Sequence, residues 1–144
     1  MLIWLLKIAG LAYLGFGALL YTAQRSFMYF PTEEIASKDV GYEYLVVGDH
    51  RLKVWTVGDA DAAGAVIYFG GNAENVFHNR DDFARLLPDQ RVYLVNYRGY
   101  GGSTGSPSEQ ALFADGLALF DRVSQRHASV ALVGRSLGSG VAAY

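Results

Sequence analysis

A serine between two glycines is the part of this chain that could carry out chemistry. Residues 134–138 read GRSLG, after an apolar run at 130–133 and before a stretch that is compatible with a helix. At a strand-to-helix junction, this G-x-S-x-G pattern predicts a tight turn that exposes the Ser136 hydroxyl. Glycine at both flanking positions lets the strand and the helix close together. The N–H groups at the start of the helix would then suit the oxyanion of an acyl-transfer intermediate.

The elements that must position this serine alternate between strands and helices. Because the chain contains 17 glycines, the motif alone is a weak signal and its surroundings decide what it means. An α/β fold is predicted, with a mostly parallel sheet of about five strands that begins with an antiparallel hairpin. The expected elements are strands 42–47 and 52–57 joined by a turn at 48–51, a buried central strand 65–69, helix 74–87, strand 91–96, a helix from 106–109 to about 126, and strand 130–133.

The start of the second helix carries its own signal. Residues 106–109 read SPSE, which fits a capping box with Ser106 as the cap and Pro107 in the first helical position. His127 would end this helix, where a cation suits the helix dipole.

The first 23 residues form an apolar segment with one charge, Lys7. As a helix it would span about 34 Å, enough to cross a bilayer core of about 30 Å. We expect a single-pass membrane anchor at 1–23, a juxtamembrane linker at 24–40 and a domain at 41–144. A cleaved signal peptide or a buried helix of a soluble protein would share this composition. The charges do not fix which side of the membrane the domain faces.

Composition narrows the classes of function. A chain of 144 residues holds one domain beside the apolar segment. A net charge of −2 gives no indication of nucleic-acid binding. The lack of cysteine excludes disulfides and thiolate metal sites.

Four motifs in order carry a resemblance to a known family. They are FGGNAEN at 69–75, VNYRGYG at 95–101, GSPS at 105–108 and GRSLG at 134–138. Together they resemble the α/β-hydrolase superfamily over residues 26–144. The nearest branch is the single-pass, membrane-anchored hydrolases related to serine aminopeptidases and protein depalmitoylases.

The resemblance implies a membrane-tethered serine hydrolase that cleaves an ester, thioester or amide of a small molecule or a lipidated substrate, without cofactor or metal. Ser136 would be the nucleophile, and the backbone N–H groups of Leu137 and Asn72 would be the oxyanion donors. Arg98 would brace loops. The sequence departs from the family at Gly70, where histidine is usual, and at Asn96, where aspartate is frequent.

A base and an acid for Ser136 are not evident in the sequence. Family members place the acid and then the histidine after the serine, but the eight residues after Ser136 include neither. We interpret His50 as an exposed turn residue and His78 as a surface or packing residue, and assign no catalytic role to His127. The expectation is therefore the N-terminal half of a hydrolase, truncated after the serine turn and inactive by itself.

Two other interpretations stay open. The first is a non-catalytic, membrane-tethered α/β-hydrolase-like domain that binds a partner, which the missing acid and base support. The second is a nucleotide-binding domain, because Gly134, Gly138 and Gly140 match the glycine spacing of short-chain dehydrogenases. That fingerprint belongs after the first strand, whereas here it follows four earlier ones.

Overall fold

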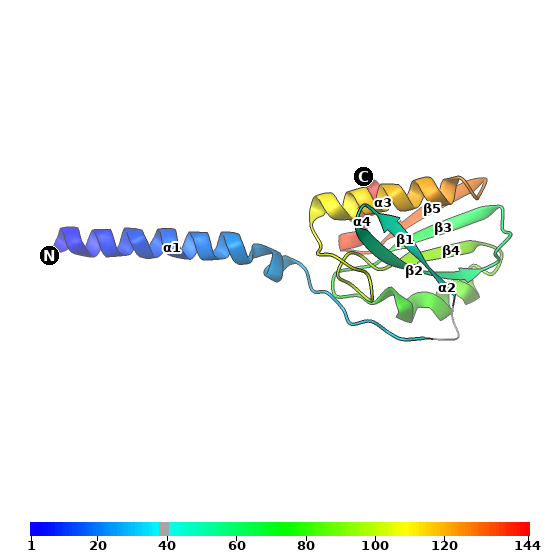
Figure 1. Ribbon diagram of the computed structural model, residues 1–144, viewed down its shortest axis with the longest axis horizontal. Helices are drawn as coiled ribbons and strands as arrows, with labels where there is room; N and C mark the ends of the chain where they lie inside the picture. Colours follow the sequence, from blue (N-terminus) through cyan, green and yellow to red (C-terminus); the bar gives the residue numbers. More distant parts are fainter. Residues whose placement is uncertain (38–40) are drawn as a thin grey trace. The chain divides into compact units, whose positions relative to one another are not determined.

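The computed structural model describes residues 1–37 and 41–144, which form two compact units, Met1–Phe30 and Pro31–Tyr144. The first unit is helix α1 (Leu2–Met28; Figure 1), whose 27 residues correspond to a length of about 40 Å. An 18-residue window of this helix has a mean hydropathy of 1.8, and it is the one helix in the described ranges that is long and apolar enough to cross a membrane. It continues five residues beyond the predicted apolar segment.

The second unit is built on a five-stranded sheet. Its strands are β1 (Tyr42–Val47), β2 (His50–Gly58), β3 (Gly64–Phe69), β4 (Arg91–Val95) and β5 (Ser129–Gly134). They lie in the order β1-β2-β4-β3-β5 (Figure 1). The pairs β1–β2 and β2–β4 are antiparallel, and β3 pairs in parallel with both β4 and β5. The predicted fold class is confirmed.

The sequence pattern explains the burial of β3 and the hairpin formed by β1 and β2. All six residues of β3 are buried, as the unbroken apolar run requires. The β1–β2 hairpin turns on two residues, Gly48 and Asp49, with Gly48 at φ +58°, a left-handed conformation that favours glycine. The predicted four-residue turn was too long. Val47 pairs with His50, so His50 is a half-buried strand residue and not an exposed turn residue.

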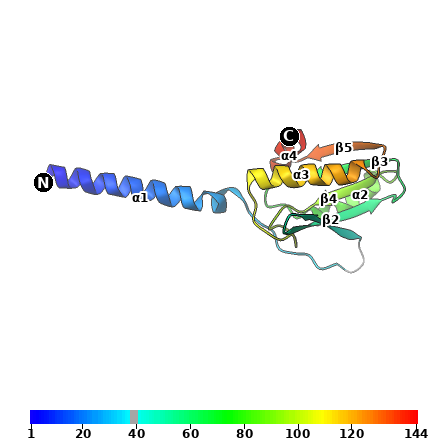
Figure 2. The same ribbon diagram turned by 45° about the horizontal axis from the view of Figure 1, so that its top comes forward.

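Helices cover both faces of the sheet (Figures 1 and 2). A 3-10 turn, η1 (Val76–Asn79), and α2 (Arg80–Leu86) lie on one face. They cover an apolar cluster of Trp55, Val66, Tyr68, Val76, Val92 and Leu94. The other face carries α3 (Glu109–Ser124) and α4 (Leu137–Ala143). The single helix predicted at 74–87 was wrong in its first part, because Asn75 caps η1 by accepting a hydrogen bond from the Phe77 N–H.

The two ends of α3 also differ from the prediction. Ser108, two residues after the predicted cap, accepts the hydrogen bond from the Ala111 N–H at 3.2 Å, so Pro107 precedes the helix. The helix ends at Ser124, and His127 is buried beyond it. The His127 ring contacts the Tyr93 hydroxyl at 2.9 Å and the Ala62 carbonyl at 2.8 Å. It is therefore a buried hydrogen-bonding residue beyond the helix and not the residue that ends it.

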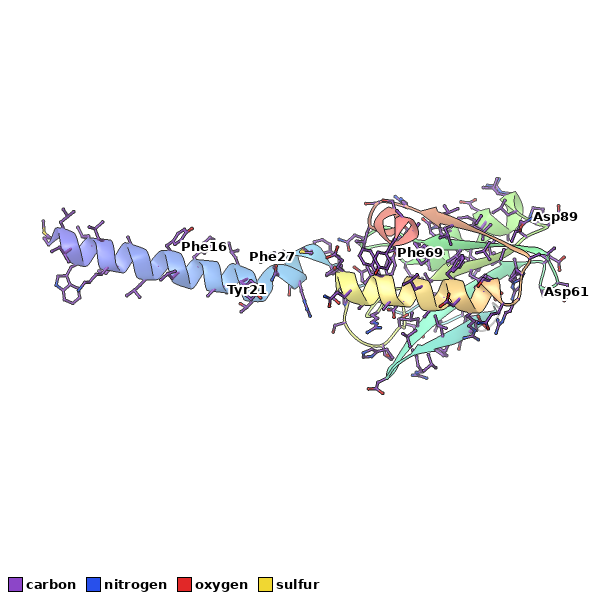
Figure 3. The ribbon with its side chains drawn as sticks, turned by 90° about the horizontal axis from the view of Figure 1, so that it is seen from above. Phe16, Tyr21, Phe27, Asp61, Phe69 and Asp89 are labelled. Carbon is purple, nitrogen blue, oxygen red and sulfur yellow. The ribbon has the colours of Figure 1, made fainter. Side chains whose placement is uncertain are left out.

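Strand β5 is an apolar edge of the described sheet. It pairs with β3, and Leu132 and Val133 remain 40% and 41% exposed. Phe69, at the end of β3, lies beside α3 and α4 (Figure 3). It borders an apolar hollow of about 210 Å³ between β5 and these two helices.

Candidate active site

Ser136 occupies the turn between β5 and α4. Its side chain is exposed, and its backbone has φ +49° and ψ −114°. A residue other than glycine with a positive φ of this kind stores strain of roughly 1–3 kcal/mol and persists only when the surrounding structure imposes it. The turn therefore presents the hydroxyl at the carboxyl ends of the parallel strands, as the sequence predicts.

Close backbone contacts on both sides explain the two glycines. A side chain at Gly134 would collide with the backbone of Gly138, and one at Gly138 would collide with the carbonyl groups of Phe69 and Gly70. The Arg135 N–H donates to the Phe69 carbonyl at 3.0 Å, which fixes the turn against the end of β3. The strand and the helix can approach this closely only because both positions lack a Cβ.

The strain at Ser136 leads to a measurable prediction. We expect Ser136→Gly to be more stable than Ser136→Ala by about 1 kcal/mol or more, because glycine adopts φ +49° without the Cβ penalty. Both variants remove the hydroxyl, so the difference between their free energies of unfolding reports the backbone strain alone. Urea unfolding of the two variants measures it, and equal midpoints would show that the turn is not strained.

The glycine-rich loop after β3 lies next to this serine. A Cβ placed on Gly71 would be 3.7 Å from the Ser136 Cβ. The Gly71 N–H is already bound by Glu74 Oε2 at 2.6 Å, so it is not a donor for a substrate. Asn72 follows it, and its Oδ1 accepts from the Tyr100 hydroxyl at 2.7 Å and from the Ala73 N–H at 3.1 Å.

Glu74 organises this loop, a role that sequence reasoning missed. Its carboxylate is 11% exposed and accepts from the Tyr68 hydroxyl at 2.7 Å and from the Asn79 side-chain amide. Arg135, inside the serine motif, pairs with it at 3.3 Å. Glu74 thus connects the loop to the serine turn. A glutamate that follows a glycine-rich turn and precedes a helix looks like a helix residue in sequence, so no local signal distinguishes it.

Two tyrosines from the turn after β4 hold the same loop. The Tyr97 hydroxyl donates to the Gly70 carbonyl at 2.8 Å, and the Tyr100 hydroxyl reaches Asn72 as described. Burial, and then the nearby Glu74, raises the pKa of Tyr97 far above its ordinary value. Burial also raises the pKa of Tyr68 to about 12, with the bond to Glu74 adding to the shift. The hydroxyls of Tyr68 and Tyr97 therefore stay protonated and continue to donate hydrogen bonds at neutral pH.

Arg98 braces the loops, as expected. Its guanidinium binds Asp115 of α3 through two hydrogen bonds of 2.7 Å, with side chains 15% and 4% exposed. Hydrogen bonding to Asp115 raises the pKa of Arg98. Asn96 is also buried, and its side-chain amide donates to the Gly101 carbonyl at 3.0 Å. Asn96 thus holds the turn after β4 in place, and it is a loop-positioning residue in this structure.

The three histidines make their contacts away from Ser136. His127 precedes β5 whereas Ser136 follows it, and a six-residue strand is about 20 Å long. His50 lies against Gly105, and His78 is on η1 with its ring against Phe77. In the ranges that the structure describes, Ser136 Oγ has no histidine or carboxylate as a hydrogen-bond partner, and no group of three or more candidate ligands could hold a metal ion.

Comparison with known proteins identifies relatives of the chain. No protein-family model matches it. It is 35% identical over 85 residues to the alpha/beta hydrolase domain-containing protein WAV2 of Arabidopsis thaliana, covering 54% of this chain and 27% of WAV2. It is 32% identical over 118 residues to the membrane protein YNL320W of Saccharomyces cerevisiae (75% and 41%). It is 36% identical over 91 residues to the lysophosphatidylserine lipase ABHD12 of Gallus gallus (57% and 24%).

Solved structures show the same fold. The epoxide hydrolase VrEH1 of Vigna radiata matches with a TM-score of 0.59 and 21% identity, covering 75% of this chain and 34% of that one. The proline iminopeptidase-related protein of Thermus thermophilus matches with a TM-score of 0.60 and 25% identity, covering 72% and 39%.

The sheet order and the serine turn are those of the α/β-hydrolase fold, and the relatives and structural neighbours of the chain are α/β hydrolases. Its apolar N-terminal helix, together with relatives named as a membrane protein and as ABHD12 lipases, fits the membrane-anchored branch of that superfamily. The chain spans less than half of the length of each relative described above.

Proposed function

We propose that Ser136 is the nucleophile of a membrane-tethered serine hydrolase that cleaves an ester, thioester or amide by acyl transfer. The observation that carries this proposal is the exposed hydroxyl on a strained turn between β5 and α4, with Gly71 directly beside it. In acyl transfer the serine oxygen attacks the carbonyl carbon of the substrate, and the carbonyl oxygen becomes an oxyanion that needs donors.

Two backbone N–H groups are the proposed oxyanion donors. The Leu137 N–H is the first of α4, where it has no partner inside the helix, and the described residues supply no other acceptor for it. The Asn72 N–H is the second, because Gly71 is already engaged by Glu74 and the bond from Tyr100 holds Asn72 beside it. Both groups belong to segments that reach the Ser136 end of the sheet.

A membrane-embedded α1 supports lipid-like or lipidated substrates. The relatives named lysophosphatidylserine lipase support an acyl ester as the substrate class. The acyl-transfer chemistry proposed here is carried by side chains and backbone groups, so it requires no cofactor or metal.

We also propose that these 144 residues do not turn over substrate by themselves. A serine hydroxyl is a poor nucleophile until a base removes its proton. The lack of such a partner among the described residues is also the observation that favours the second candidate, a tethered α/β-hydrolase-like domain that binds without catalysis.

A fluorophosphonate probe tests both proposals. In membranes from cells that express the gene, we expect an adduct on the peptide that contains Ser136. Ser136→Ala should abolish the adduct, and Ser129→Ala, at the other end of β5, should preserve it. The purified 144-residue chain should not hydrolyse p-nitrophenyl butyrate.

Each outcome has a separate meaning. Lack of an adduct in the membranes would refute the nucleophile and favour the binding domain. Ester hydrolysis by the purified chain that is lost in Ser136→Ala would refute its inactivity and leave the nucleophile in place.

A further inference from the structure

Residues 31–37, here called the strap, are bonded to the loop beside Ser136 and to the turn after β4 that holds this loop. The Gly101 N–H donates to the Thr32 carbonyl at 2.9 Å. The side-chain amide of Asn75 donates to the Glu33 carbonyl at 2.8 Å. These are contacts between a segment that precedes the sheet in the chain and two loops that follow β3 and β4.

Lys53 of β2 anchors the strap. Its side chain is 2% exposed, and its ammonium donates to Glu34 Oε1 at 2.9 Å and to the Ile35 carbonyl at 3.3 Å. It also lies 4.4 Å and 4.5 Å from the ring centroids of Trp55 and Tyr42. A buried ammonium is costly unless it is paired, and both of its oxygen acceptors come from the strap.

Gly102, in the turn after β4, leaves room for the Glu34 carboxylate of the strap. Gly102 has φ +93°, and a Cβ there would be 2.7 Å from Glu34 Oε1. A residue with a side chain would therefore displace the carboxylate from its position beside Lys53.

Both loops held by the strap contribute to the candidate site. Asn75 belongs to the loop of Gly71 and Asn72, and Gly101 belongs to the turn from which the Tyr100 hydroxyl reaches Asn72. The strap thus contacts, from outside, the two segments that determine where the Asn72 N–H lies relative to Ser136.

We propose that the strap is a positioning element for the oxyanion side of the site, with Lys53 as its anchor and Asn75 as its contact to the loop. The role in catalysis rests on the proposed function of Ser136, whereas the role in ordering the loops does not. Lys53 and Asn75 act through Asn72 and are positioning residues that do not touch the substrate.

Two variants release the strap in different ways. Asn75→Asp keeps the oxygen that accepts from the Phe77 N–H and so keeps the cap of η1, but it loses the donor to Glu33. Lys53→Met removes the buried cation together with its need for Glu34. Asp82→Asn, which breaks an exposed ion pair with Arg85, is the matched control.

The first measurement is amide hydrogen exchange of the 144-residue chain in detergent micelles. We expect both variants to accelerate exchange about fivefold at residues 70–75 and 99–104, the effect of one lost hydrogen bond. Exchange in β3 and β4 should be unchanged, and the control should match the wild type. Unchanged exchange in both loops of Asn75→Asp would overturn the proposal, even if Lys53→Met failed to fold.

The second measurement is the rate at which a fluorophosphonate labels Ser136 in membranes from expressing cells. Loss of oxyanion positioning should lower the maximal labelling rate about tenfold, with the half-saturating probe concentration unchanged. A change in the half-saturating concentration alone would overturn the positioning role. If the wild type were not labelled, the nucleophile would be refuted, and hydrogen exchange would still decide whether the strap orders the loops.

Discussion

Gly138→Ala is expected to destabilise the Pro31–Tyr144 unit by about 3 kcal/mol or more. The new methyl group would lie inside contact distance of the Phe69 carbonyl carbon and oxygen and of the Gly70 oxygen. These are backbone atoms at the end of β3, so they cannot move aside without breaking the pairing of β3 with β5. Thermal and urea unfolding, followed by circular dichroism, measure the loss.

The chain offers a matched control for this substitution on the same helix. A Cβ at Gly140 meets nothing within 4 Å, so Gly140→Ala should be neutral or stabilising by up to about 1 kcal/mol. If Gly138→Ala cost no more than Gly140→Ala, the close approach of α4 to β3 would be incorrect.

Asp115→Ala is expected to cost about 3–5 kcal/mol, because it leaves the Arg98 guanidinium largely buried without its partner. The pair joins the turn after β4 to α3 through two bonds of 2.7 Å. Asp82→Ala removes the partner of Arg85 in an exposed pair and should cost less than about 1 kcal/mol.

A double variant separates the charge from the contact. Arg98→Met with Asp115→Leu removes both ions and keeps apolar volume, so it should recover much of the stability lost in Asp115→Ala. A double variant as unstable as Asp115→Ala would show that hydrogen-bond geometry, and not the unpaired cation, sets the cost.

Regular elements of the fold could be predicted where one local pattern determined them. β3 is an unbroken apolar run that became a fully buried strand. The turn from β5 to α4 lies where its glycine spacing indicates. The cap of α3 could not be assigned from pattern alone, because Ser106 and Ser108 are both competent caps and only the folded turn selects the second.

The supporting residues of the site were harder to predict because their partners are distant in sequence. Tyr97 bonds to Gly70, and Arg98 bonds to Asp115, across 27 and 17 positions. His127 looked like a helix-terminal cation, but contacts with Tyr93 and Ala62 bury it. Local chemistry identified Ser136 as a candidate, whereas the network around it depends on which strands become neighbours. The roles of Ser136, Leu137 and Asn72 stay predictions until the probe experiment is done.

The position of β3 between β4 and β5 has a consequence for biosynthesis. Its two neighbours arrive late, because Ala65 pairs with Arg91 and Gly64 pairs with Ser129. A ribosome adds about 5–20 residues per second, so β5 follows β3 by roughly 3–13 seconds. During that interval one edge of this fully buried strand lacks its partner while the chain is still growing. Nascent chains of this protein should therefore depend on chaperones that shield apolar strand edges during translation.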